Sequence, residues 1–382
     1  MNKPTLALAV SAALTSPAAF ADVEVGPFAL YGTLHSALEV ISVDNVNATI
    51  AKTKDSQARL ADQTSKLGFK IKHDLADGMF ALAQVESRVY LGNNGDNTDN
   101  KAELGSRNTF AGIGSKRAGV LRLGRYDNAF KLALKSATPT LYGNLNDAVN
   151  DYGSKQILNR LGARQGDMIA YESPSLGGFT ANVSYNLGKD ATSAATDLMP
   201  QLALGMGYKV GALTLGLGYT SLNNASWDLS KSSGFAAKNN PGDQKLDAVQ
   251  FGGEYKFGKY SVGAVYERTS SSLSGSTAVP ATASFDRTQD VYGLTGGYQD
   301  GPLTVQLRFA TANDVKGTTV TDTGARQIGV AVAYQLHKNL AAVGSLTSVK
   351  NDKNATFTSA SGFALDKGNS MTQLALGLAV SF

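Results

Sequence analysis

The sequence contains 382 residues, among them 41 glycines, 9 prolines and no cysteine. Basic residues outnumber acidic ones by only 4, an excess too small to indicate a nucleic-acid partner or a polybasic membrane anchor. The absence of cysteine excludes disulfide bonds as a source of stability. No change of composition and no linker divides the chain after residue 21 into separate domains.

The first 21 residues have the features of an export signal. Lys3 supplies a positive charge, residues 6–14 form a short apolar run, and Ala19-Phe20-Ala21 fits the small-x-small cleavage pattern. The apolar run is too short for a membrane-spanning helix, which needs about 20 apolar residues. We therefore predict a signal peptide over residues 1–21 and a single domain over residues 22–382. Removing Lys3 lowers the net charge from +4 to +3.

The rest of the chain is dominated by a two-residue alternation, which predicts strands with two different faces. Residues 201–208 place leucine, methionine and tyrosine on one face and glutamine, alanine and glycine on the other. Residues 213–220, 303–309, 328–334 and 374–382 repeat this pattern, and tyrosine and phenylalanine gather near the strand ends. A soluble β-sandwich also alternates. The small polar face and the terminal aromatic residues favour a membrane β-barrel with aromatic girdles.

Short and long connections alternate along the chain and predict the strand number. Seven short turns and eight long loops imply sixteen antiparallel strands, and a barrel of that size encloses a lumen too wide for side chains to fill. The short connections are residues 74–78, 115–118, 174–177, 210–212, 257–259, 300–302 and 337–339; the long ones are 43–61, 91–102, 126–165, 188–199, 223–244, 270–287, 313–323 and 351–369.

Several motifs resemble those of the Gram-negative general diffusion porins, and of their β-proteobacterial branch in particular. They are Leu30-Tyr31-Gly32, Ser65–Lys70, Phe110–Ile113, Val120–Arg125 and Ile169–Pro174. The resemblance implies a sixteen-stranded transmembrane barrel with short periplasmic turns, long external loops and a third loop folded into the lumen. It also implies a homotrimer in the outer membrane that contacts lipid and lipopolysaccharide. Each subunit would let small hydrophilic solutes and ions diffuse passively, and the terminal Phe382 would belong to the barrel-assembly signal.

The third long loop, residues 126–165, is the predicted constriction. At about 40 residues it exceeds the usual loop length, and it carries apolar residues that a loop in free solution would not need. Its charged residues are mixed. They include Asp127, Asp147 and Asp151 as candidate carboxylates, and Lys131 and Lys135 beside them as basic residues.

The strand phase predicts a basic wall opposite this loop. With Leu67, Phe69 and Ile71 facing outward, the lysines between them face the lumen. With Phe110 outward, Arg107, Thr109 and Ala111 would face inward. The predicted lining comprises Lys66, Lys70, Lys72, Gln84, Glu86, Arg88, Arg107, Arg122 and Arg164. By resemblance, Lys66, Arg107 and Arg164 match the basic ladder of the family, whereas Thr33 stands where many members have a further basic residue.

A basic wall facing a partly basic loop predicts a mild preference for anions, because such rings of charge attract counter-ions. The alternative is that several of these side chains pair with acidic residues or point to bulk water. An adhesin or purely structural barrel is a second functional hypothesis. A barrel hydrolase is a third, but His35, His73 and His337 have no visible catalytic partner in the sequence. We predict no enzymatic activity, no cofactor and no metal, although residues 93–100 are rich in oxygen ligands suited to Ca²⁺.

Overall fold

The computed structural model describes residues 23–25, 27–44, 56–63, 65–91, 103–140, 157–188, 199–223, 225–226, 229–230, 236–237, 244–273, 285–358 and 365–382. The predicted signal peptide, residues 1–21, and the oxygen-rich tract, residues 93–100, lie outside the described residues and stay predictions. Asp147 and Asp151 of the third loop also lie outside them. Among the described residues, no helix is both long enough and apolar enough to cross a bilayer.

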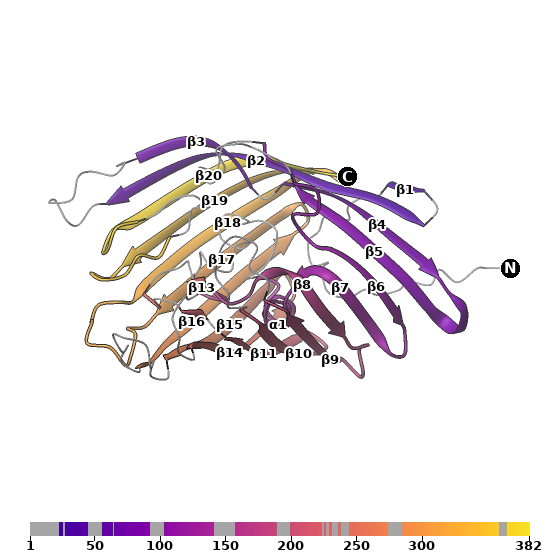
Figure 1. Cartoon of the computed structure of the whole chain (residues 1–382). Coiled ribbons are helices and arrows are strands. Elements are labelled where there is room, and N and C mark those ends of the chain that lie inside the picture. Colours follow the sequence, from indigo (N-terminus) through magenta and orange to yellow (C-terminus); the bar gives the residue numbers. More distant parts are fainter. Residues whose placement is uncertain are drawn as a thin grey trace.

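The described chain is almost entirely β-structure (Figure 1). Its helical segments are α1 (Ala129–Ala137) and the single turn η1 (Ala76–Gly78). The strands are β1 (Val23–Val25), β2 (Phe28–Asp44), β3 (Ser56–Asp62), β4 (Lys66–Asp74), β5 (Met79–Arg88), β6 (Thr109–Ser115), β7 (Gly119–Asp127), β8 (Arg164–Glu172), β9 (Phe179–Asn186), β10 (Gln201–Val210), β11 (Leu213–Asn223), β12 (Ala225–Ser226), β13 (Ala236–Ala237), β14 (Gln244–Phe257), β15 (Tyr260–Leu273), β16 (Phe285–Asp300), β17 (Leu303–Ala312), β18 (Ala325–His337), β19 (Leu340–Asn351) and β20 (Ser370–Ser381).

One antiparallel sheet closes on itself to form the barrel. Residues 33–44 of β2 pair with residues 370–381 of β20, and Gly32 and Phe382 exchange backbone hydrogen bonds of 2.9 and 3.1 Å just beyond. The sheet has 18 strand segments. β3 and β4 share one position beside β2, and β1 continues the line of β20 along β2, so the barrel has sixteen strand positions. The predicted sixteen-stranded antiparallel barrel is confirmed.

Two of the predicted long loops are shorter than predicted because strands extend into them. β3 begins at Ser56, inside the stretch predicted as the first long loop, residues 43–61. After Asp62 the ladder is interrupted, and the Ser65 hydroxyl accepts a hydrogen bond of 2.8 Å from the backbone N–H of His35 on β2. Similarly, β15 extends to Leu273 and β16 begins at Phe285, so both strands reach into the predicted loop 270–287.

The two faces of the sheet follow the predicted alternation. On β10, Leu202, Leu204 and Met206 are exposed on the outer face, whereas Gln201 and Ala203 are buried on the inner face. β20 repeats this arrangement, with its leucines between residues 374 and 378 exposed outside. Because one face is apolar and the other small and polar, a shift by one residue would exchange them, and the pattern therefore determines the register.

β6 has the opposite phase to the one predicted. Phe110, predicted to face outward, is buried on the inner face, and Ala111 and Ile113 are exposed outside. The register requires this, because Ala111 pairs with the outward-facing Leu123 of β7. Arg107 nevertheless faces inward, since it precedes the strand in an irregular segment without two-residue alternation. The inference of its direction from the phase of Phe110 was wrong.

The beginning of the third loop folds into the barrel, as predicted, and forms α1 along the inner faces of β10, β11 and β14 (Figure 1). Asn128 caps the helix by accepting a 2.9 Å hydrogen bond from the backbone N–H of Lys131. Glycines on the wall allow this approach. A Cβ on Gly216 would lie 2.5 Å from the Ala133 carbonyl oxygen, and a Cβ on Gly252 would lie 2.9 Å from Leu134 Cδ1.

Other long connections fill further parts of the interior. Leu158 of the third loop and Phe357 of the last long connection are fully buried, and they belong to one apolar cluster with Ile41 and Val291 of the wall. A second cluster joins Phe130 of α1 to Leu229, which follows β12. The described parts of these connections therefore pack mainly against the inner wall of β10–β20 and the adjoining part of β2.

The close approach of α1 to Gly216 leads to a prediction about stability. Gly216→Ala should destabilise the folded protein by about 1–3 kcal/mol, because the new methyl group would overlap the backbone of α1. Gly296→Ala is the matched control, since its Cβ would meet only Leu307 at an ordinary 3.8 Å. Thermal unfolding of both variants measures the difference. Equal stability of the two variants would show that α1 does not contact the barrel wall at Gly216.

Candidate functional site

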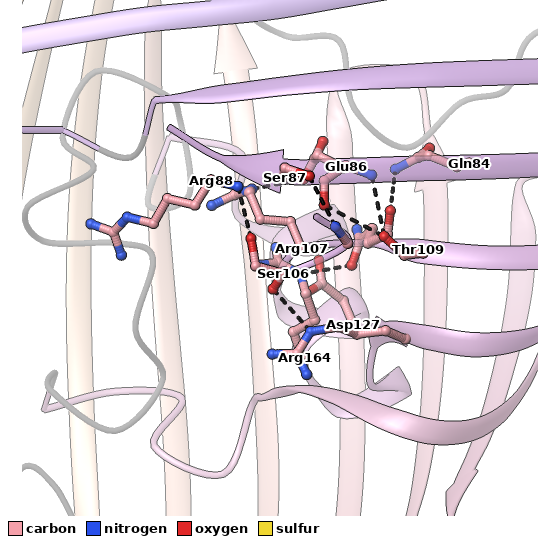
Figure 2. Close-up of polar contacts among 12 residues, drawn as sticks. Gln84, Glu86, Ser87, Arg88, Ser106, Arg107, Thr109, Asp127 and Arg164 are labelled. Atoms are coloured by element: carbon pink, nitrogen blue, oxygen red, sulfur yellow. Dashed lines mark hydrogen bonds and ion pairs between the residues drawn. The ribbon is translucent and has the colours of Figure 1, made fainter. Parts of the chain in front are cut away.

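Glu86 is the centre of the charged wall on the inner face of β2–β8 (Figure 2). Its carboxylate accepts a 2.7 Å hydrogen bond from Arg107 Nε and a 2.9 Å hydrogen bond from the Tyr31 hydroxyl. Tyr31 reaches Glu86 from β2 by crossing β4 at Gly68, where any Cβ would collide with its ring. Lys70 Nζ lies 4.1 Å from the centroid of the same ring.

A second centre is Asp127, at the end of β7. Its carboxylate lies 3.2 Å from Lys131 Nζ on α1 and 3.2 Å from Arg164 Nε on β8. Arg164 Nε also donates a 2.7 Å hydrogen bond to the side-chain oxygen of Asn108. Asp127 is only 3% exposed. It therefore connects the first turn of the third loop to the wall and is not a free carboxylate facing the lumen.

Arg122 on β7 occupies an aromatic and acidic environment. Its guanidinium lies 4.7 Å from the centroid of the Tyr126 ring and 5.3 Å from that of Phe110. Arg122 Nη1 lies 3.1 Å from a carboxylate oxygen of Glu172, which also accepts a 2.8 Å hydrogen bond from the Tyr126 hydroxyl. Because Phe110 faces inward, its ring forms one side of the site that surrounds the Arg122 guanidinium.

Two further ion pairs lie nearer the long-loop end. Arg88 Nη2 is 3.5 Å from Asp62, and Arg59 Nε is 2.7 Å from Glu39. Glu39 also accepts a 2.9 Å hydrogen bond from Gln373 of β20, so this pair joins the strands where the barrel closes. The sequence analysis missed Arg59 because it lies in a segment predicted to be loop.

Most, but not all, of the predicted lumen-lining residues lie close together in the structure. Lys66, Glu86, Arg88, Arg107, Arg122, Asp127, Lys131 and Arg164 lie on the charged wall or at its junction with α1. Gln84 donates a 3.1 Å hydrogen bond to the Asn108 backbone beside them. Lys72 lies toward the short-turn end of β4, 3.7 Å from Asp74. Lys135 lies in the last turn of α1.

Sequence reasoning did not identify the acidic partners Glu39, Asp62 and Glu172. Each could have been found from the strand phase, because each alternates with outward apolar residues or adjoins them. Their pairing with particular arginines could not, since the partners are 20–50 residues apart in the chain: Arg59 with Glu39, Arg88 with Asp62, and Arg122 with Glu172.

Acidic side chains on the far side of the barrel anchor the third loop. Glu254 of β14 accepts a 2.8 Å hydrogen bond from the backbone N–H of Thr140, and Glu267 of β15 accepts one of 2.6 Å from that of Asn159. Arg160 donates to the Leu229 carbonyl at 2.9 Å and to Gln289 at 2.7 Å. Burial lowers the pKa of the Arg160 guanidinium to about 10, which still leaves it charged at neutral pH.

The charged wall as a whole carries an excess of positive charge. Its five carboxylates are each within ion-pairing distance of an arginine or lysine. Eight basic residues face these five acids, which leaves a net charge of +3; the basic residues are Arg59, Lys66, Lys70, Arg88, Arg107, Arg122, Lys131 and Arg164, and the acidic ones are Glu39, Asp62, Glu86, Asp127 and Glu172. Charges on such a wall act on mobile ions in the lumen.

The sequence matches the Gram-negative porin family over residues 7–354. The chain belongs to this family. An outer membrane porin protein of Bordetella pertussis is 27% identical over 306 residues, which cover 73% of this chain and 72% of that protein. The anion-selective porin from Comamonas acidovorans has a similar structure, with a TM-score of 0.70 and 21% identity over 93% of this chain and 99% of that one. A trimer form of the outer membrane protein OmpT of Vibrio cholerae has a TM-score of 0.66 and 14% identity, and covers 94% and 100% of the two chains.

The porin therefore resides in the outer membrane of a Gram-negative bacterium, and its barrel is a diffusion pore. That the short turns lie on the periplasmic side and the long loops on the external side stays a prediction from their lengths. Within the described residues, no group of three or more histidine, aspartate or glutamate side chains is arranged to hold a metal ion.

Removal of the central carboxylate tests the electrostatics of the wall. Glu86→Gln should raise the preference of the porin for chloride over potassium by about two- to fivefold, because a unit charge at 4–8 Å in water is worth roughly 0.5–1 kcal/mol. Reversal potentials in a KCl gradient measure this ratio. Asp300→Asn, at the exposed β16–β17 turn, is the control. An unchanged potential in Glu86→Gln would mean that permeating ions do not sense this wall.

Proposed function

We propose that this porin is a general pore for small hydrophilic solutes and ions with a mild preference for anions. The observation that carries the proposal is the excess of basic over acidic residues on the wall of β2–β8. Pairing of the carboxylates reduces the field of this wall without cancelling it, so the preference should be mild. The anion-selective porin from Comamonas acidovorans, which shares the fold, supports the same direction.

The position of the third loop adds to this argument. Helix α1 packs against the inner faces of β10, β11 and β14, away from most of the charged wall, and its Lys131 brings a further positive charge to Asp127. Ions that pass the barrel would therefore travel beside the wall.

Planar-bilayer recording tests the proposal directly. The wild-type protein should give a large, steady conductance that increases in proportion to the salt concentration. Its reversal potential in a KCl gradient should be displaced from zero toward the equilibrium potential of chloride. Lys66→Glu changes the wall by two charges and should lower the chloride-to-potassium ratio by several-fold at low salt, and by less at high salt because of screening. Lys338→Glu, in the exposed β18–β19 turn, is the control. A sealed barrel would contradict the pore, and a Lys66→Glu variant with wild-type potential would contradict the anion mechanism.

We further propose that the porin forms a homotrimer through the outer face of β19, β20 and β2–β7. Exposed tyrosines such as Tyr208, Tyr260, Tyr292 and Tyr334 lie on the outer face of β8–β18. Near the short turns, four aromatic rings are in successive contact with centroids 5.2–6.2 Å apart: Tyr255, Phe257, Tyr260 and Tyr298. Within its described residues, the outer face of β19–β7 has no outward-facing tyrosine. Because tyrosine belts mark the border between lipid and water, this arc is suited to a neighbouring subunit.

A bulky substitution on each part of the outer face, β19–β7 and β8–β18, tests which part contacts a neighbouring subunit. Ala83→Trp, on the outer face of β5, should shift the trimer toward monomers because tryptophan would not fit between closely packed subunits. Ala264→Trp, on the outer face of β15, should leave the trimer intact because lipid accommodates the ring. Size-exclusion chromatography with light scattering in detergent measures the assembly. Two stable trimers would place the interface elsewhere.

A further inference from the structure

Three apolar side chains lie on the inner wall of the barrel near the short turns. Phe80 and Leu82 share the inner face of β5 with Gln84 and Glu86, and both are partly exposed. Val120 is partly exposed on the inner face of β7. Apolar surface in contact with water is unfavourable, and a contiguous patch of it commonly marks a binding site. Phe80, Leu82 and Val120 are called the lumen patch below.

Two glycines of β6 make the lumen patch continuous. Gly114 lies between Phe80 and Val120, and a Cβ at this glycine would lie 2.9 Å from Phe80 Cζ and 3.0 Å from Val120 Cγ2. A Cβ at Gly112 would lie 3.1 Å from Leu82 Cδ2. Because β6 contributes no side chain at these two positions, the side chains of β5 and β7 approach each other over it.

Two lysines border the lumen patch on β4. Lys70 and Lys72 are both exposed on the inner face of this strand. Lys72 is the cross-strand partner of Leu82, and its Nζ lies 4.6 Å from the centroid of the Phe80 ring. Lys72 Nζ also lies 3.7 Å from Asp74, but the Asp74 side chain is 86% exposed, and ion pairs between exposed groups are weak. A solute at this edge therefore meets positive charge directly beside apolar surface.

The opposite edge of the lumen patch is electrically balanced. On β7 and β8, Arg122 Nη1 lies 3.1 Å from a carboxylate oxygen of Glu172, so these two charges largely offset each other. Helix α1 packs against β10, β11 and β14 and leaves the strands of the patch accessible from the lumen. The charge and the apolar surface together define an orientation, with an anionic group toward β4 and an apolar group toward β7.

We propose that the lumen patch and the two lysines form a subsite for small organic anions that combine a carboxylate with an apolar chain or ring. The ammonium groups of Lys70 and Lys72 would donate charge-assisted hydrogen bonds to the carboxylate, while the apolar part covers Phe80 and Leu82. Small-molecule sites commonly combine an apolar lining with a few polar groups in this way. The inference deepens the proposed function and rests on it, because the anion must first enter the lumen.

Single-channel KCl conductance in planar bilayers tests the subsite with three six-carbon probes: hexanoate, gluconate and hexanamide. Gluconate has the charge of hexanoate but a hydroxylated chain, and hexanamide has the apolar chain without the charge. Hexanoate should reduce the KCl conductance of the wild type with an apparent Kd about tenfold lower than that of gluconate, because burial of about two methylene groups gives such a factor. Hexanamide should bind as weakly as gluconate, because it forms no ion pair with the lysines.

Two variants remove the two halves of the subsite separately. Phe80→Ser/Leu82→Ser should bind hexanoate no more tightly than gluconate, and Lys70→Gln/Lys72→Gln should bind hexanoate no more tightly than hexanamide. The second variant keeps the test decisive if the first does not fold. The matched control is Leu294→Ser/Phe309→Ser, which changes the same two residue types at a cross-strand pair on the outer face of the barrel. It should retain the wild-type preference for hexanoate.

The outcomes separate the subsite from the pore itself. Equal affinity of a conducting wild-type channel for hexanoate and gluconate would overturn the subsite alone, and so would a wild-type preference in the Phe80/Leu82 variant. Equal block by hexanoate and hexanamide would also overturn it, because the lysines would then contribute nothing. A barrel that conducts no KCl in the absence of probe would overturn the proposed function and the subsite together.

Discussion

Closure of the sheet between β2 and β20 is the constraint on which the rest of the structure depends. In lipid, every backbone N–H and C=O must find a partner within the protein, and a closed barrel provides these partners without leaving an edge. The last residue takes part, because Phe382 and Gly32 exchange two backbone hydrogen bonds where the ring of strands meets. Once the barrel is closed, each strand has one face toward the outside and one toward the interior.

The interior then has to accommodate both packed loops and charge. Glycines of β10, β11 and β14 let α1 lie close to the wall, and the carboxylates of Glu254 and Glu267 hold the returning chain through its backbone. These interactions concentrate apolar packing on one side of the lumen. The charged residues of β2–β8 occupy the other side, where Glu86 and Asp127 each contact more than one basic or polar side chain.

The exterior is divided in a comparable way. An arc with tyrosines near both ends of its strands lies beside an arc with apolar side chains and no outward tyrosine among its described residues. In the proposed trimer, this division would follow from the different requirements of a lipid border and a protein contact.

The sequence by itself determined the barrel, its sixteen strands and the outward face of most strands, because the two-residue alternation and the sequence of short and long connections are local properties. Strand phase also predicted that Lys66 and Arg122 face inward. It failed at β6, where the apolar Phe110 faces inward and packs against Tyr126 and Arg122, and at β3, where polar residues such as Arg59 concealed a strand. Only the tertiary structure decided which acid neutralises which base and where α1 lies. Those contacts join strands that the barrel brings together from distant parts of the chain, and no local pattern encodes them.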